Sequence, residues 1–151
     1  MTPKAQTGQT AEAMATLALV REGFEVSLPV FTSPAFDLVS KWGRAIHAIQ
    51  IKTGHIKPNG KTVQWPTSHI GRFYHKNDCS FFGLVLIPKG EIWWLPVEVI
   101  GPRSSVCTNI DTDQLAEFRG NFESLKKCDE KCDWLLGCSK NPIKKGVKRT
   151  L

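Results

Sequence analysis

FDLVSKWGRAIHAIQIK, residues 36–52, predicts a β-hairpin that the rest of the chain is built around. Residues 36–39 and 45–51 are short apolar runs rich in residues that favour strands. Residues 42–44 (WGR) supply the turn between them, because glycine at position 43 can adopt a positive φ at little cost. The two runs are therefore expected to pair as antiparallel strands.

Polar side chains gather at one end of this predicted hairpin. Gln50 and Lys52 alternate along the second strand, so their side chains leave the same face, with the Ile51 carbonyl between them. Asp37 lies across the hairpin on the first run. Taken singly, each residue also fits a structural role, Asp37 as a turn or capping carboxylate and the other two as solvated strand positions. Taken together, they predict a compact site for a metal ion and a phosphate group.

The segment before the hairpin predicts a helix over residues 11–23, AEAMATLALVREG. Thr10 is the expected N-cap, and Gly23 is a suitable residue just past the C-terminal end. This boundary places Glu12 in the first turn, where the helix dipole favours an anion. Its neighbours on the same helix face are mostly apolar, so we expect Glu12 to lean toward the sheet.

The remaining elements predict a mixed α/β (α+β) fold, a mixed central sheet flanked by helices. The expected elements are a strand over 24–30, a basic hairpin or loop over 54–68 with a short strand-like segment at 62–65, a helical turn or irregular link over 70–78, strands over 81–87 and 92–100, and a helix over 111–127. A chain of 151 residues favours a single domain, here ending in a basic tail at about 140–151.

Bulk composition favours a nucleic-acid partner. The formal net charge is +6, and positive residues cluster in 57–72 and 140–149. The first residues, MTPKAQTGQT, lack an apolar secretory core, and no run is long enough to span a bilayer. These features predict a protein of the cytoplasm, associated with the DNA of a bacterium, an archaeon or a phage, and no membrane partner.

The ordered motif resembles that of a known family. An Asp, twelve residues, and then Gln-Ile-Lys resembles the signature of the PD-(D/E)XK nucleases, with Gln where an acid is usual. The Gln variant is similar to group I intron-encoded homing endonucleases of cyanobacterial type, and the N-terminal half also looks like an archaeal Holliday junction resolvase. The matching residues are Gly8, Glu12, Gly23, Phe24, Asp37, Gln50, Ile51 and Lys52.

The resemblance implies a restriction-endonuclease-like core and a magnesium-dependent active site, in which Mn²⁺ can substitute. Asp37, Glu12 and the Ile51 carbonyl would be the metal ligands, since hard oxygen atoms suit Mg²⁺. Gln50 would offer a neutral oxygen to the metal or orient a water molecule. Lys52 would hold the attacking water and screen the phosphate. Glu12, Asp37, Gln50 and Lys52 are thus the expected catalytic residues.

The resemblance also implies an activity and an assembly. We expect a site-specific endonuclease that cuts both strands of double-stranded DNA, working as a homodimer or homotetramer because one short chain carries one site. Trp93, Trp94 and the C-terminal helix are candidates for the subunit interface. Two alternatives stay open: a Holliday junction resolvase, and a catalytically inactive DNA-binding module.

Basic and aromatic residues interleave after the hairpin, a pattern typical of DNA contacts. The alternative is a solvated loop with its aromatic residues in the core. The candidate DNA-binding residues are Lys57, Lys61, Trp65, Arg72, Tyr74 and Lys76.

Two further features carry weaker hypotheses. His47 falls on the strand face opposite Gln50 and is expected to pack against a helix. Four of the five cysteines raise the possibility of a zinc site, although the spacing is not that of a usual zinc knuckle and buried thiols fit it as well. These cysteines are Cys107, Cys128, Cys132 and Cys138.

Overall fold

The computed structural model describes residues 1–32, 35–69 and 71–128. Helix α1 covers Pro3–Glu22 and so begins well before the predicted start. The Thr2 side chain caps it, proline occupies the first helical turn, and Gly23 ends it at a φ of 109°. Thr10 is therefore not the cap, and its hydroxyl instead donates to a carbonyl one turn back at 2.9 Å. Glu12 lies in the middle of the helix, which corrects its predicted place in the first turn.

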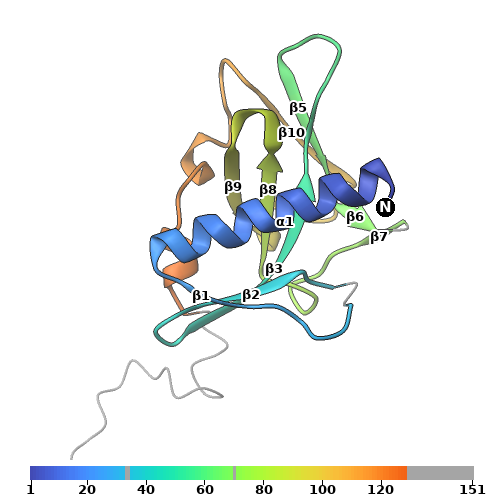
Figure 1. Cartoon of the computed structure of the whole chain (residues 1–151). Helices are drawn as coiled ribbons and strands as arrows, with labels where there is room; N and C mark the ends of the chain where they lie inside the picture. The colour runs from blue at the N-terminus through green and yellow to red at the C-terminus, as the bar shows by residue number, and fades with distance from the viewer. Residues whose placement is uncertain (33–34, 70, 129–151) are drawn as a thin grey trace, which may run out of the picture.

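The central sheet is mixed, as predicted, and runs in the order β1-β2-β3-β8-β9 (Figure 1). Its strands are β1 (Glu25–Ser27), β2 (Leu38–Trp42), β3 (Ala45–Thr53), β8 (Phe81–Leu86) and β9 (Glu91–Pro96). β2 and β3 form the predicted hairpin around Gly43, whose φ is 57°. β3 and β8 are parallel and all other neighbours are antiparallel.

The parallel pairing of β3 and β8 requires a crossover, which residues 54–80 provide. This crossover contains four short strands. One of them, β5, pairs with β4 on one side and with a strand from later in the chain on the other, in the order β10-β5-β4. The strands are β4 (His55–Ile56), β5 (Thr62–Pro66), β6 (Ser68–His69), β7 (Arg72–Phe73) and β10 (Ser105–Asn109). The predicted strand at 62–65 is confirmed, whereas β10 was not predicted.

The central sheet buries both faces. α1 crosses one face (Figure 1), where its Ala15 and Leu19 pack in a core that includes Ile49. The second sheet packs on the other face through fully buried Trp65. Successive residues of a strand point to opposite faces of the sheet, and here both faces are buried. This explains why β8 and β9 are almost continuously apolar.

The two adjacent tryptophans of β9 belong to these two cores. Trp94 is 1% exposed and lies on the α1 side, and Trp93 is 3% exposed and lies on the other. The Trp93 indole N–H donates to the Asp113 carboxylate at 2.8 Å. Since both side chains are buried within the chain, the prediction that they form a subunit interface is wrong.

The predicted helix over 111–127 is also wrong. Two 3₁₀ turns, η2 (Ala116–Phe118) and η3 (Glu123–Lys126), flank Gly120, whose φ of 62° interrupts any helix. The Asp113 carboxylate accepts hydrogen bonds from the Trp93 indole and from the Thr108 hydroxyl, each at 2.8 Å, so it does not cap a helix. The other helical turns are short, η1 (Ile87–Lys89) and α2 (Val97–Ile100), and α2 replaces the end of the strand predicted to reach residue 100.

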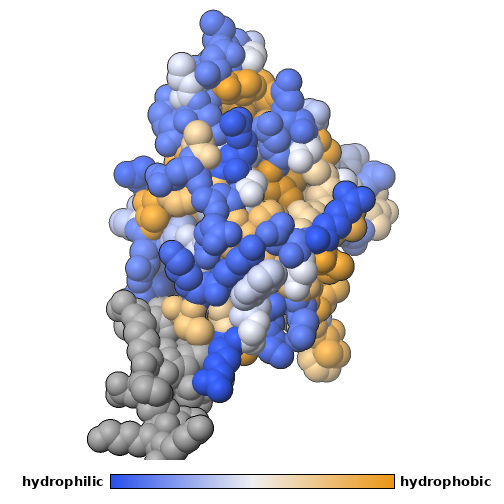
Figure 2. Space-filling model, turned by 90° about the vertical axis from the view of Figure 1, so that its left-hand side faces the viewer, coloured by the Kyte–Doolittle hydropathy of each residue, from blue (hydrophilic) through white to orange (hydrophobic). Residues whose placement is uncertain are grey.

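Seen from the side in Figure 2, the molecular surface is mainly hydrophilic, with apolar groups visible between the polar ones. None of the helices in the described residues is long and apolar enough to pass through a lipid bilayer.

Gly54→Ala is expected to lower the free energy of unfolding by about 1–3 kcal/mol, the usual cost of overpacking. A Cβ atom there would lie 2.6 Å from Cε2 of Trp65, whose indole is fully buried and donates to the Val85 carbonyl at 3.0 Å. Denaturant unfolding followed by circular dichroism measures the change.

Gly8→Ala is the matched control, because a Cβ at position 8 meets nothing within 4 Å and alanine favours a helix interior. It should raise the free energy of unfolding by up to about 1 kcal/mol. Equal stability of the Gly54→Ala variant and the wild type would contradict the proposed packing.

Candidate active site

Asp37 lies just before β2 and ties the start of the hairpin to β3. Its backbone N–H donates to the Ile49 carbonyl at 2.9 Å, which continues the strand pairing by one residue. Its carboxylate Oδ2 accepts two hydrogen bonds, from the Ile51 backbone N–H at 2.7 Å and from Gln50 Nε2 at 2.6 Å. The carboxylate is thus held over the end of β3 by one backbone and one side-chain donor.

The Gln50 amide is buried and only half satisfied. Its Nε2 also donates weakly to the Ile51 carbonyl at 3.4 Å, so the NH₂ group lies between two oxygen atoms. Its Oε1 is buried and has no hydrogen-bond partner in the described part of the chain. A buried acceptor without a donor is costly, and a group that binds to it would remove that cost.

Lys52 leaves β3 on the same face as Gln50, as the alternation predicts, and its side chain is half-buried. Its Nζ donates to the hydroxyl of Tyr74 at 3.1 Å and lies 4.7 Å from the centroid of that ring. Burial lowers the pKa of Lys52 from its ordinary value, although the charges of Asp37 and Cys79 act in the opposite direction.

A second carboxylate, on an exposed residue of α1, interacts electrostatically with Asp37. This residue is Glu12, and its pKa is raised by burial and then by the negative charge of Asp37. The pKa of Asp37 is raised by burial, even though the hydrogen bonds from Ile51 and Gln50 and the charge of Lys52 lower it. A hydrogen bond joins Asp37 to Gln50, and the charge of Lys52 acts on Asp37. Glu12 is connected with this group through its electrostatic interaction with Asp37.

The oxygen atoms of this cluster fit a hard divalent cation. The Asp37 carboxylate and the Ile51 carbonyl already converge on one NH₂ group, and the orphaned Gln50 oxygen belongs to the same side chain. Rotation of that amide would direct an oxygen instead of two protons at the same place. No group of three or more His, Cys, Asp or Glu side chains arranged for a metal occurs within the described residues.

An open cleft runs past Ile51 and Lys52 at the edge of this cluster. One wall is the N-terminal part of α1, and the other is formed by the end of β3 and by β6. Besides Lys52, the cleft has three basic or titratable residues that sequence reasoning did not assign to a site: Lys4, His55 and His69. The helical spacing Lys4–Gly8–Glu12 was the available signal, but the helix predicted from the sequence begins only at residue 11, whereas α1 begins at Pro3.

The predicted DNA-binding residues fall into separate groups. Lys57 and Lys61 lie on the β4–β5 hairpin, and the exposed Arg72 pairs with Asp78 at 3.8 Å. Lys76 lies 3.7 Å from Glu98 and is also exposed.

Two aromatic residues of that prediction have roles within the fold. Trp65 is 0% exposed, so its assignment as a DNA contact is corrected to that of a core residue. Tyr74 is half-buried and contacts Lys52.

The histidine and cysteine hypotheses have different outcomes. His47 is 3% exposed, packs edge-on against Phe81 and makes a 2.7 Å hydrogen bond with the Lys127 carbonyl beside η3, so it is a packing residue. Cys107 and Cys128 are exposed. Cys132 and Cys138 lie outside the described residues, so the zinc hypothesis stays a prediction.

Comparison with known proteins identifies the class. The family model described as PD-(D/E)XK endonuclease matches residues 1–119, and the chain belongs to that family. Its members are endonucleases, enzymes that hydrolyse phosphodiester bonds in nucleic acid. No curated protein matched the chain. Among solved structures, the bacterial homing endonuclease I-Ssp6803I superposes with a TM-score of 0.73 at 17% identity, covering 92% of this chain and 100% of the other. That likeness confirms the restriction-endonuclease-like fold.

In the absence of divalent metal, Asp37→Asn is expected to gain stability relative to the wild type as the pH rises from about 4 to 7. The folded-state pKa of Asp37 is raised, so the wild type binds more protons when folded and loses stability as the pH passes through that pKa. The Asp37→Asn variant does not lose this stability, because the asparagine side chain does not titrate. Urea unfolding in EDTA at several pH values measures the difference, and a difference that stays constant or shrinks with rising pH would contradict the assignment.

Proposed function

We propose that the protein is a metal-dependent, site-specific endonuclease of the homing type that cuts both strands of double-stranded DNA. The observation that carries this proposal is the cluster of Glu12, Asp37, Gln50 and Lys52 beside an open cleft with basic walls. The family supplies the reaction class, and the similar fold of a bacterial homing endonuclease supports the finer reading.

Asp37, the Ile51 carbonyl and Glu12 would hold Mg²⁺, with Gln50 turned so that its oxygen joins them and Mn²⁺ as a substitute. The cation would supply Lewis-acid stabilisation of negative charge on the phosphate. Gln50 needs no proton transfer to change partners, because rotation of its amide exchanges donor for acceptor. Asp37 stays fixed by the Ile51 N–H throughout, so the ligand geometry depends on the backbone of β3.

Lys52 would hold the attacking water and contact the scissile phosphate. Its burial disfavours the charged form, so a phosphate entering the cleft would gain a weakly hydrated ammonium group as its partner. Both the hydrogen bond to Tyr74 and the proximity to Asp37 hold the ammonium at the edge of the cleft.

The DNA backbone would follow the cleft. Lys4, His55 and His69 line it together with Lys52, and contacts from such residues to phosphate position a duplex without reading its sequence. Lys57 and Lys61 on the β4–β5 hairpin, with Arg72 and Lys76 beyond, would extend the contact. The basic segment at 140–151, outside the described residues, would add further phosphate contacts.

Cutting two strands with one site per chain requires at least two chains, so we propose a homodimer or homotetramer. A candidate contact surface lies in the loop after β1, where Leu28, Val30 and Phe31 are 64%, 91% and 85% exposed. Large apolar side chains gathered in one exposed loop are a common feature of association surfaces. The proposed location is the cytoplasm.

Two alternatives remain. A Holliday junction resolvase would use the same chemistry but recognise the shape of a four-way junction. An inactive DNA-binding module would keep the basic cleft without cleavage. The intact contacts of Asp37 and Lys52 favour an active enzyme.

The deciding experiment is digestion of a plasmid library and of a synthetic four-way junction, with Mg²⁺ or EDTA at matched salt. The proposal expects linear products from a limited set of duplex sites, with Mg²⁺ only. Asp37→Ala and Lys52→Met should each lower the cleavage rate by about 10³-fold or more, since each removes a group that acts in the transition state.

DNA affinity in Ca²⁺ should change by less than about threefold in these variants, because each removes at most one of the many contacts that position the duplex. Lys41→Met, at a surface lysine paired with Glu25, is the matched control and should cleave normally. Cleavage confined to the junction would support the resolvase instead, and undiminished cleavage by Asp37→Ala would exclude the assigned site.

Gln50→Glu is expected to lower the melting temperature in EDTA and to increase the rise caused by Mg²⁺. Without metal, a carboxylate at position 50 cannot donate to the Asp37 oxygen that lies 2.6 Å from the amide, and two like charges face each other. With metal, the same charge adds a ligand, and binding to the folded state raises its stability.

Differential scanning calorimetry with EDTA, Mg²⁺ or Ca²⁺ measures both effects without any cleavage. Gln64→Glu on β5, where the amide donates to Ser105 at 3.0 Å, is the matched control and should show the wild-type response to metal. An unchanged response of Gln50→Glu would show that position 50 does not face the cation.

A further inference from the structure

Tyr74 contacts the predicted catalytic lysine through both its hydroxyl and its ring. The Lys52 ammonium donates to its hydroxyl at 3.1 Å and lies 4.7 Å from its ring centroid, within the range of a cation–π interaction. One side chain therefore holds the ammonium in two ways, through a lone pair on oxygen and through the ring face.

The Tyr74 ring is itself held in place. It packs edge-on against Phe82 of β8, with centroids 5.3 Å apart and an interplanar angle of 87°. Phe82 is 1% exposed and belongs to the core between the two sheets. Because the ring has only two rotatable bonds and packs on a core residue, it can hold the end of a flexible lysine side chain in place. Burial raises the pKa of Tyr74 to about 12, so the hydroxyl stays neutral at physiological pH.

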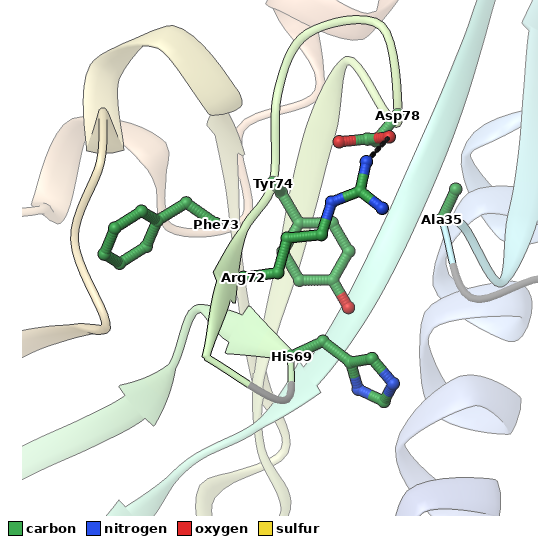
Figure 3. Close-up of a pocket in the computed structure, with 6 residues that line it drawn as sticks. All are labelled: Ala35, His69, Arg72, Phe73, Tyr74 and Asp78. Atoms are coloured by element: carbon green, nitrogen blue, oxygen red, sulfur yellow. Dashed lines mark ion pairs between the residues drawn. The ribbon is translucent and has the colours of Figure 1, made fainter.

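The Lys52–Tyr74 pair lies where two hollows of the surface adjoin. Lys52 lines the large cleft, Tyr74 lines a smaller pocket of about 330 Å³, and His69 lines both. Figure 3 shows the Tyr74 hydroxyl pointing to the side of the pocket where His69 lies, while the ring of Phe73 points away. The ammonium is therefore held at a point that a DNA backbone crossing from one hollow to the other would pass.

We propose that Tyr74 is the positioning residue of Lys52, fixing its ammonium at the edge of the cleft where it meets the scissile phosphate. This role rests on the proposed function and differs from the DNA contact that the sequence alone suggested for Tyr74. A DNA contact would contribute to affinity, whereas a positioning residue contributes to the rate of the bound complex.

The kinetic test compares Tyr74→Phe and Tyr74→Ala with the wild type on the same DNA with Mg²⁺. Tyr74→Phe keeps the ring and loses the hydrogen bond to a charged donor, so kcat should fall roughly tenfold with KM unchanged. Tyr74→Ala loses both contacts, so its kcat should be lower still. The difference in kcat between the phenylalanine and alanine variants measures the contribution of the ring, separately from that of the hydroxyl. In the Lys52→Met background, neither substitution should have an additional effect on the residual rate.

A second measurement needs no cleavage. The chain contains a single tyrosine, so selective ¹³C labelling of tyrosine gives one set of ring resonances for the whole protein. Lys52→Met should shift these resonances, because the ammonium lies against both the ring and the hydroxyl. Lys41→Met, which removes the same charge at a surface position, should not.

The outcomes are distinct. A reduced kcat with unchanged KM, together with the shifted resonance, supports the proposal. Wild-type kcat in Tyr74→Phe, a change confined to KM, or an unshifted resonance in Lys52→Met overturns it. A wild type that cuts no DNA removes the proposed function, and the resonance then still decides whether Tyr74 holds Lys52.

Discussion

The carboxylate of Asp37 is the point on which the active end of the molecule depends. One oxygen accepts from the Ile51 backbone and from the Gln50 side chain, so it joins the segment before β2 to the last residues of β3. Such charge-assisted bonds are shorter and stronger than neutral ones, which agrees with their lengths of 2.7 and 2.6 Å. The hairpin turn at Gly43 sets the register, and this pair of bonds closes its open end.

The site is maintained at an electrostatic cost that the fold tolerates. Burial shifts the pKa values of Asp37 and Lys52 toward their neutral forms, and this effect exceeds the attraction between them. Gln50 adds a buried oxygen without a partner. Buried charges and unsatisfied polar groups of this kind concentrate at binding sites, since a ligand can provide the charge or the hydrogen-bond partner that they lack. The sheet beneath, covered by α1 on one face and by β10-β5-β4 on the other, supplies the rigidity that holds them.

The amino-acid sequence predicts those parts of the fold that local patterns determine. The glycine turn, the alternation of Gln50 and Lys52 and the mixed sheet follow from short stretches, and the structure has them. The start of α1 was misplaced because Thr10 looked like a cap, although Thr2-Pro3 is the stronger signal.

The parts that failed depend on contacts between distant residues. The segment 111–127 has an apolar spacing suitable for a helix, but Asp113 bonds to the indole of Trp93 and Gly120 breaks the backbone. Trp65 looks like a stacking residue until its strand is known to pack on β8 and β9. Tyr74 and Lys52 are far apart in the chain, so no local pattern could show that they touch.

The crossover between β3 and β8 has a consequence for how the protein acquires its shape. Two parallel strands cannot be joined by a tight turn, so β8 can pair with β3 only after the connecting residues 54–80 have crossed the sheet. The β2–β3 hairpin, by contrast, can form as soon as its own residues are available. During synthesis the contact between Asp37 and Gln50 can therefore form before Phe82 is available to pack against Tyr74. The acidic part of the site would be in place before the contact that we propose to position Lys52.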